Sequence, residues 1–300
     1  LYYNLGDYEK AESFFRRSIE GNEVTLGKDH PTTLTNIGNL ALVFNDIGEY
    51  EKAEVLYNDV LFAYEKTLGV SHPDTLLTVN NLGMLYHNLG DYDKAKTFYR
   101  RSIEGHEVAL GKDHPMTLKS IGNLAQLFND IEDYKNAIVQ YKIFIDLQNK
   151  QLGSEVLDTF VSINNLGLAY YNSGDYENAE PLFLEALAGY KKILEPSDEN
   201  IRVTTNNLAL TYTALGNNKK TIEYYKILID LEEDQLGPIA HKTLLSKNDL
   251  GLTLFNLGNY VQAKILFEQA AEGLKDTLGS DHPDTAQVFE NKVAAEKEIN

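Results

Sequence analysis

Residues 26–50 read LGKDHPTTLTNIGNLALVFNDIGEY, and this stretch decides the fold because its parts return at a fixed interval. Its opening Leu-Gly pair recurs in steps of 42 residues, at 26–27, 68–69, 110–111, 152–153, 236–237 and 278–279. Its His-Pro pair lies at 30–31, 72–73, 114–115 and 282–283. The 300 residues therefore hold about seven copies, and such self-similarity indicates a repeat protein.

Each copy contains two amphipathic helices. The first is predicted over 31–47, where apolar residues spaced three and four apart share one face: Ile37, Leu40, Ala41, Phe44 and Ile47. Pro31 suits the first helical turn, and Gly48 ends the helix. The second is predicted over 50–68, with Gly69 as its cap. Because one helix pair cannot bury both of its apolar faces, the copies are expected to stack into an all-α solenoid.

The copies follow the tetratricopeptide (TPR) pattern, in which Leu-Gly-x2-Tyr precedes Ala-x3-Phe. The first half is present at Leu82-Gly83-x2-Tyr86 and Leu166-Gly167-x2-Tyr170. The second half, ending in Phe or Tyr, is found at Ala11-x3-Phe15, Ala53-x3-Tyr57, Ala95-x3-Tyr99, Ala137-x3-Tyr141, Ala179-x3-Phe183 and Ala263-x3-Phe267. Ile or Val replaces the Trp of the pattern, and the copy is longer than the usual 34 residues. This longer form resembles the TPR arrays of kinesin light chain and nephrocystin-like proteins over nearly the whole chain.

The resemblance implies a right-handed superhelical solenoid of about seven helix-turn-helix repeats that binds proteins and is not an enzyme. We expect one TPR domain over 1–300, with repeat boundaries near 31, 73, 115, 157, 199, 241 and 283. Residues 1–5 correspond to the end of a first helix, so the first repeat is expected to be truncated and the chain to be part of a longer protein. Lys292 and Glu296 replace core residues, which predicts that 283–300 forms a cap.

Composition restricts the classes of partner. Asp and Glu number 45 against 27 Lys and Arg, which gives a formal net charge of −18. An acidic surface repels phosphate backbones and anionic lipid, so we expect neither a nucleic-acid partner nor membrane insertion. The sequence has no cysteine, which excludes disulfides, cysteine-ligated metals and thiol catalysis. We expect a cytoplasmic protein without a cofactor.

The first helix of each copy carries a polar stripe opposite its core face, exemplified by Asn39, Leu42 and Asp46. Followed through the copies, these positions define three rows. The asparagine row is Asn39, Asn81, Asn123, Asn165, Asn207, Asp249 and Asn291. The leucine row is Leu42, Met84, Gln126, Leu168, Leu210 and Leu252. The end row is Asp46, Asn88, Asp130, Asn172, Ala214 and Asn256.

Two interpretations of the rows are open. In related TPR arrays, asparagine at the matching position binds peptide backbone in the concave groove, so the resemblance implies a peptide-binding groove here. An amide side chain offers both donors and an acceptor, and the leucine row would contact apolar side chains of the peptide. Alternatively, the asparagines bond to the neighbouring helix and the leucines pack between repeats.

The charge of the stripe narrows the expected peptide. Chaperone-type TPR clamps hold a terminal carboxylate with Lys or Arg, but only Lys119 lies one turn before the asparagine row. The equivalent positions are Thr35, Leu77, Val161, Val203 and Leu245. Kinesin light chains favour Trp among acidic residues, read by basic groove residues that are mostly missing here. With Asp46, Asp130 and Asp249 on the wall, we expect a neutral or basic, partly apolar peptide.

The repeated histidines are expected to have a structural role. The repeated histidines lie about 10 Å apart on stacked repeats, too far to share a metal ion, so we expect them to set helix starts. They are His30, His72, His114 and His282.

Two further functions stay open: a structural subunit that uses convex or end surfaces of the array, and a sensor array attached to an effector enzyme domain outside this sequence.

Overall fold

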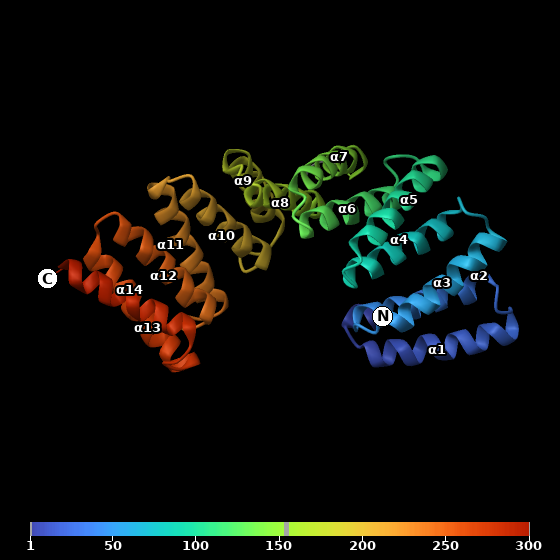
Figure 1. Ribbon diagram of the computed structural model, residues 1–300, viewed down its shortest axis with the longest axis horizontal. Coiled ribbons are helices and arrows are strands. Elements are labelled where there is room, and N and C mark those ends of the chain that lie inside the picture. The colour runs from blue at the N-terminus through green and yellow to red at the C-terminus, as the bar shows by residue number, and fades with distance from the viewer. Residues whose placement is uncertain (1, 153–155, 300) are drawn as a thin grey trace. The chain divides into compact units, whose positions relative to one another are not determined.

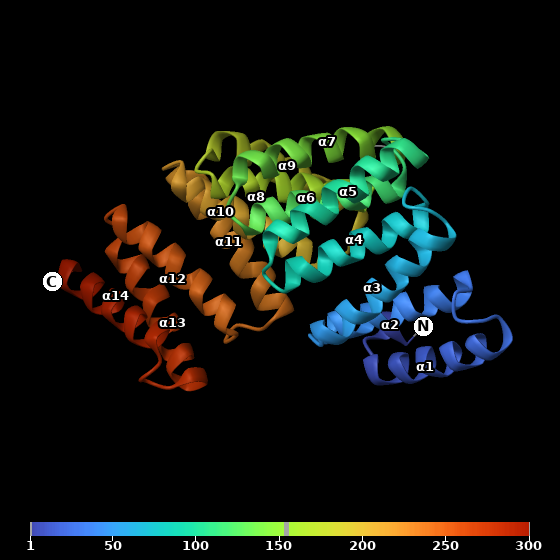
Figure 2. The same ribbon diagram turned by 45° about the vertical axis from the view of Figure 1, so that its right-hand side comes forward.

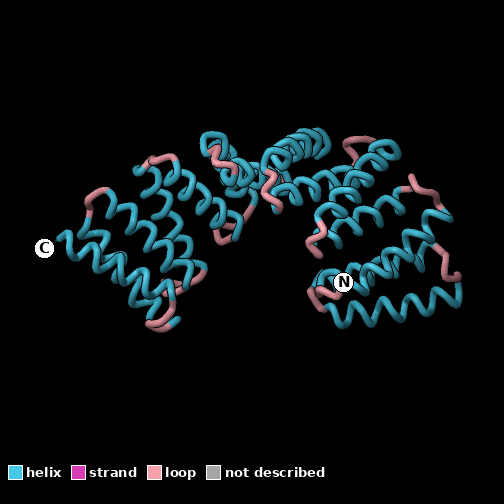
Figure 3. Tube along the Cα trace, in the orientation of Figure 1, coloured by secondary structure: helices cyan, strands magenta, loops and turns pink. Residues whose placement is uncertain are grey.

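The computed structural model describes residues 2–152 and 156–299, which form helices and short loops without a strand (Figure 3). The predicted all-α helical repeat solenoid is confirmed. The chain divides into two compact units, residues 1–154 and 155–300. The expectation of one continuous domain over 1–300 stays a prediction. Gly153, from the fourth Leu-Gly pair, lies outside the described residues.

The helices of each unit pair as hairpins that stack in chain order (Figures 1 and 2). The first unit contains η1 (Tyr3–Leu5), α1 (Tyr8–Thr25), α2 (Pro31–Asp46), α3 (Tyr50–Thr67), α4 (Pro73–Asn88), α5 (Tyr92–Leu110), α6 (Pro115–Asp130) and α7 (Tyr134–Leu152). The second contains α8 (Leu157–Asn172), α9 (Tyr176–Ile193), α10 (Glu199–Ala214), α11 (Asn218–Gln235), α12 (His241–Asn256), α13 (Tyr260–Leu278) and α14 (Pro283–Ile299). Even-numbered helices are the first helices of their repeats.

The repeated connection builds a specific helix start. The imidazole Nδ1 of four histidines accepts a hydrogen bond of 3.2 Å from the backbone N–H two residues later, in His30, His72, His114 and His282. This contact caps the helix, as the sequence predicted. Gly69 has φ of +94°, a conformation that favours glycine, and its carbonyl accepts a 2.8 Å hydrogen bond from the Thr75 hydroxyl. Local chemistry therefore fixes where one repeat ends and the next begins.

Small residues of the TPR pattern allow close packing inside each hairpin. A Cβ atom at Gly83 would lie 2.7 Å from the ring of Tyr99 on the following helix. Gly167 and Phe183 repeat this contact in the second unit, at 2.9 Å. Such distances are shorter than packed carbon atoms allow, so only glycine fits. The buried ring of the following helix thus occupies the space that a side chain at the glycine would fill.

Candidate peptide-binding site

The predicted stripe lines a small cavity in the first unit. The cavity, of about 90 Å³, lies between α2 and α4 and is lined partly by Thr35, Asn39, Leu77 and Asn81. Both asparagines are half-buried. Tyr57 forms part of the lining from α3, and its buried hydroxyl has no hydrogen-bond partner among the described residues. The asparagine row therefore borders a recess that is partly polar and partly apolar.

Some members of the asparagine row bond to a neighbouring helix. The Nδ2 atom of Asn123 donates to Oδ1 of Asn80 at 3.1 Å, and Asn291 donates to Asn248 at 2.8 Å. In both cases the acceptor lies 43 residues earlier, on the first helix of the preceding repeat. Gly38 occupies the register of Asn80 one repeat earlier and can accept no such side-chain bond. The amides of Asn123 and Asn291 are thus already used within the fold.

Other members of the row keep their amides available. The side chains of four residues make no hydrogen bond to a described residue: Asn39, Asn81, Asn165 and Asn207. All four are half-buried. A half-buried amide with unmet donors and acceptor can bind a peptide group without first breaking an internal bond. The structure therefore divides the predicted row into bonded and unbonded positions.

The leucine row is mostly an accessible apolar surface. Its members Leu42, Met84, Leu168 and Leu210 are half-buried, which leaves part of each side chain open to contact. Gln126 is exposed and differs from them because both ends of its amide are used. It donates to Asp130 at 2.7 Å and accepts from the hydroxyl of Tyr141 at 2.9 Å.

The end row is exposed and partly cross-linked. Asn88 donates to Oδ1 of Asn45 at 3.2 Å, across neighbouring repeats. Asp130 pairs with Nε2 of His87 at 2.9 Å. Asn172, in the second unit, is exposed and makes no side-chain hydrogen bond to a described residue. Lys119, the basic residue predicted beside the asparagine row, is exposed and forms no ion pair within the described chain.

A larger cavity, of about 350 Å³, lies between α10 and α12 in the second unit. Stripe residues form its walls, with Val203 and Leu210 on α10 and Leu245 and Asp249 on α12. Burial raises the pKa of Asp249 to about 6. A hydrogen bond with Asn248 opposes this increase, and the neighbouring negative charge of Glu232 adds to it. The predicted stripe is therefore hollowed and acidic at this place.

Sequence profiles agree with this architecture. One profile described as tetratricopeptide repeat matches residues 1–66, 74–142 and 158–231, and another with the same description matches 243–284. Together they span most of the chain. The chain belongs to the tetratricopeptide repeat family. No curated protein sequence matches this TPR chain.

Solved structures of TPR proteins share the fold. BtubC (BKLC) from P. vanneervenii is 22% identical, with a TM-score of 0.64 over 77% of this chain and 91% of that one. The nearly identical TPR-like repeats of a candidate kinesin light chain from Podosopora anserina are 22% identical, with a TM-score of 0.61 over 69% and 98%. The C-terminal part of a TPR repeat-containing protein from Cytophaga hutchinsonii is 16% identical, with a TM-score of 0.61 over 96% of each chain. These structures share the TPR fold of this chain.

Membership of the family supports a general role as a protein–protein interaction scaffold. TPR proteins are typically scaffolds without enzymatic activity. Within the described residues, no three His, Cys, Asp or Glu side chains gather as a metal site. None of the described helices combines the length and hydropathy that a bilayer-spanning segment requires.

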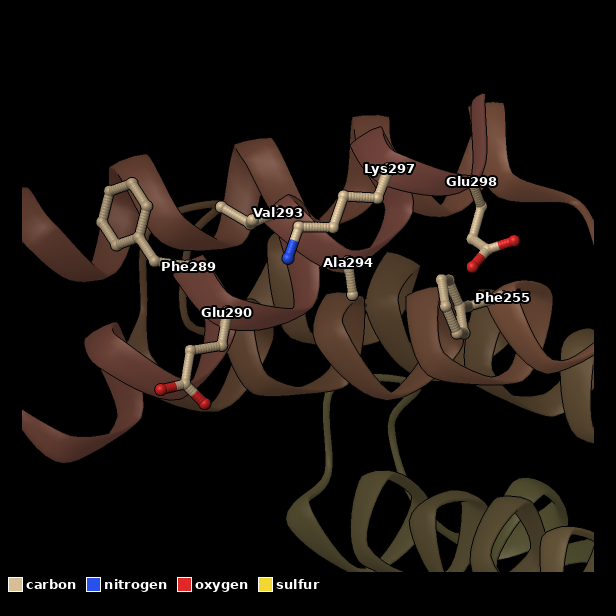
Figure 4. A pocket seen from close by; sticks show the side chains of 7 residues that line it. All are labelled: Phe255, Phe289, Glu290, Val293, Ala294, Lys297 and Glu298. Atoms are coloured by element: carbon tan, nitrogen blue, oxygen red, sulfur yellow. The ribbon is translucent and has the colours of Figure 1, made fainter. Parts of the chain in front are cut away.

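A third recess of the TPR array lies between α12 and α14, the first helices of its last two repeats. It has a volume of about 440 Å³ and is lined by Phe255 on α12 and by six residues of α14. Figure 4 shows Glu298 beside the Phe255 ring, and Lys297 extending along α14 toward Val293. On the other side of α14, Lys292 pairs with Glu268 at 2.8 Å. Residues 283–299 thus place charges on both sides of the helix predicted to be a cap.

Three buried charged residues escaped the sequence analysis: Arg202, Glu232 and Lys247. Arg202 and Glu232 line the cavity between α10 and α12, and their exposed fractions are 7% and 3%. The stripe was followed at position 203, one residue away from Arg202. Comparison of the core registers reveals them, because the residues that correspond to Arg202 are Leu34, Leu76, Leu118, Phe160, Leu244 and Ala286. An arginine at a position that is apolar in every other repeat is the sequence feature that could have indicated this site.

Proposed function

We propose that this chain is an adaptor that binds a peptide segment of a partner protein along the polar stripe of its first helices. The observation that carries the proposal is the set of half-buried asparagines with unbonded amides, which border an accessible apolar row. Their amides supply hydrogen bonds to the peptide backbone, while Leu42, Met84, Leu168 and Leu210 contact its apolar side chains. A stripe held by rigid helices lowers the ordering cost of binding on the receptor side.

The charge of the stripe supports a neutral or basic, partly apolar peptide. Lys119 stands without an acidic partner in the described chain, but one cation is too few for a two-carboxylate clamp. Acidic side chains are more numerous on the same face: Asp46 and Asp130 are exposed in the first unit, and Asp249 is half-buried in the second. Electrostatic attraction would accelerate capture of a basic segment. We also propose that the adaptor acts in the cytoplasm and performs no chemical step itself.

A matched pair of variants tests the proposal. The test variant combines Asn81→Ala, Asn165→Ala and Asn207→Ala, which removes amides that make no hydrogen bond within the described chain. The control variant combines Asn123→Ala and Asn291→Ala, which removes amides already bonded to a neighbouring helix. Proteins captured from a cell extract are identified by mass spectrometry. Helicity and thermal unfolding of each variant are measured beside it.

We expect partners that bind the wild-type chain and the control variant to be lost from the folded test variant. Retention of every partner by the test variant would contradict the proposal. That outcome would favour a structural subunit that uses second-helix surfaces, where Phe14 and Phe62 are exposed. The sequence of the full-length protein decides separately whether the array serves as the sensor of an enzyme domain.

A further inference from the structure

The junction between α10, α11 and α12 carries charges at registers that are uncharged elsewhere in the array. Arg202 stands where the other repeats have Leu, Phe or Ala. Glu232 stands where they have Asn22, Tyr64, His106, Gln148, Tyr190 and Leu274. Lys247 occupies a register otherwise filled by Ile, Val, Thr or Phe. Asp249 replaces the asparagine of its row. Buried charges rarely stabilise a fold as well as apolar residues do, so this concentration requires an explanation.

Two of these charges are neutralised within the protein. Nη2 of Arg202 lies 2.7 Å from Oε1 of Glu199, and Nζ of Lys247 lies 2.7 Å from Oε1 of Glu233. Arg202 also approaches Glu232, but the distance between Nη1 and Oε1 is 4.0 Å, longer than a hydrogen bond. Lys247 is therefore engaged by Glu233, and Arg202 by Glu199 and, at longer range, by Glu232, while Nε of Arg202 has no hydrogen-bond partner among the described residues.

Two carboxylates remain at the cavity. Glu232 is 3% exposed, and its Oε2 atom has no hydrogen-bond partner among the described residues. Burial raises the pKa of Glu232, and Ser246, Arg202 and Lys242 oppose only part of that increase. Asp249 lines the same cavity. A buried carboxylate oxygen without a donor is costly, and a donor that enters the cavity would remove that cost.

The lining of the cavity is partly apolar. Val203, Leu210 and Leu245 supply its aliphatic side chains, and Val203 is 38% exposed; Arg202, Asn206 and Ser246 line it beside the two carboxylates. Lys242 also lines the cavity, but it is exposed and its long side chain can turn toward solvent. An acidic floor beneath aliphatic walls is complementary to a side chain with an alkyl stem and a cationic end. Lysine and arginine are the natural side chains of this shape.

We propose that the cavity between α10 and α12 binds a lysine or arginine side chain of the partner, with Glu232 and Asp249 as acceptors for its charged end. The inference rests on the proposed peptide-binding function and specifies one residue of the peptide. The stem would pack against Leu210 and Leu245, and the cation would donate to Oε2 of Glu232. A volume of about 350 Å³ accommodates one such side chain.

Small probes test the pocket without knowledge of the partner. Nα-acetyl-arginine amide is titrated into the intact chain, and Nα-acetyl-citrulline amide serves as a neutral probe of the same shape. Nα-acetyl-glutamate amide reports on anion binding through Arg202 and Lys242. NMR of leucine methyl groups follows Leu210 and Leu245 in the pocket, with Leu42 of the first unit as an internal reference.

We expect the arginine probe to shift the methyl signals of Leu210 and Leu245 saturably and to bind at least about fivefold more tightly than citrulline, a difference of about 1 kcal/mol. Asp249→Asn and Glu232→Gln should each weaken the arginine probe by about fivefold and leave citrulline unchanged. Asp249→Asn installs the residue found in the other repeats and is expected to fold. Asp59→Asn, at an exposed position of α3 outside the stripe, is the control and should change neither affinity.

The affinity should also fall between about pH 7.5 and about pH 5, since Asp249 loses its charge in that range. The charged and titratable groups that act on Asp249 and Glu232 are Arg202 on α10, Tyr225 on α11 and Lys242 on α12. The pKa of Asp249 is about 6, and burial raises the pKa of Glu232 as well. Asp249→Asn should therefore reduce the pH dependence, and Glu232→Gln in addition should abolish it.

Three outcomes would overturn the inference: equal binding of arginine and citrulline, tighter binding of the glutamate probe, or no shift of the pocket leucines with any probe. Each leaves the proposed function separately testable. If the Asn81, Asn165 and Asn207 variant still loses its partners, the peptide-binding stripe stands and only the basic-residue pocket fails. If the arginine probe binds but that variant keeps all its partners, the stripe fails and the pocket is an isolated site.

Discussion

Phe160 and Tyr190 occupy in one repeat the two registers that Arg202 and Glu232 occupy in the next. The aromatic pair packs edge to face, with ring centroids 6.3 Å apart and both side chains buried. A Cβ atom at Gly189 would lie 2.3 Å from the Phe160 ring, so glycine creates the space for it. In the charged repeat the same register holds Leu231. The two junctions thus share a backbone plan and differ in what they bury.

This difference separates residues that stabilise the array from residues suited to bind. The aromatic pair gains free energy from burial and ring contact. The charged pair sacrifices part of that gain, because desolvation offsets the attraction between Arg202 and Glu232 at 4.0 Å. The charged junction also borders a cavity of about 350 Å³, whereas the ring of Phe160 packs directly against α9. Under the proposed function, stability and recognition belong to neighbouring repeats of one unit.

Removal of the aromatic contact should have the largest effect. Phe160→Ala is expected to lower the free energy of unfolding by about 3–5 kcal/mol, since it removes a buried ring and leaves a cavity. Urea unfolding followed by circular dichroism measures the loss. Val203→Ala, at a partly exposed position one repeat later, should cost less than about 1 kcal/mol. Equal losses in the two variants would mean that the aromatic junction is not the stabilising one.

Conversion of the charged junction into an apolar one should stabilise the chain. The double variant Arg202→Leu with Glu232→Tyr copies the pair Leu34 and Tyr64 of the first unit. We expect a gain of about 2 kcal/mol, because two buried charges are replaced by groups of lower desolvation cost. The same urea experiment measures it, and the arginine probe should no longer bind. A loss of stability would show that the charged pair is itself a stabilising element.

The charge of Asp249 should lower stability only when it is ionised. Burial raises its pKa to about 6 in the folded chain, so the folded state binds the proton more tightly than the unfolded state. That contribution is present below about pH 4 and is lost as the pH rises through 6. Asp249→Asn should therefore raise the free energy of unfolding by about 1–2 kcal/mol near pH 7.5 and have little effect near pH 4. An equal effect at both pH values would argue against titration of this group.

The smallest effect should distinguish the bonded from the unbonded asparagines of the first unit. Asn123→Ala removes the 3.1 Å hydrogen bond to Asn80, whose Nδ2 atom already has no partner among the described residues. We expect a loss of about 1 kcal/mol. Asn81→Ala removes no internal hydrogen bond and should change stability by less than about 0.5 kcal/mol. Thermal unfolding of both variants checks the order, and a larger loss for Asn81→Ala would reverse the assignment.

Much of the fold was predictable because its determinants are local. The helix predicted over 31–47 is observed as α2 (Pro31–Asp46), and the one predicted over 50–68 as α3 (Tyr50–Thr67). The histidine caps were also expected from their place before a helical proline. The stripe could be followed from register alone, and it lines cavities in both units. Its role in binding stays a prediction.

By itself, the sequence determined the repeat length, the bounds of the two helices of one copy to within a residue, and which face of those helices is apolar. Those features depend on residues within one or two helical turns of each other. Only the tertiary structure decided which asparagines are available, because Asn123 and Asn80 meet across 43 residues while Asn81 finds no such acceptor. It also brought Arg202, Glu232 and Asp249 to one cavity from three helices. Stacking sets these contacts, and their energies depend on burial and geometry that no local pattern records.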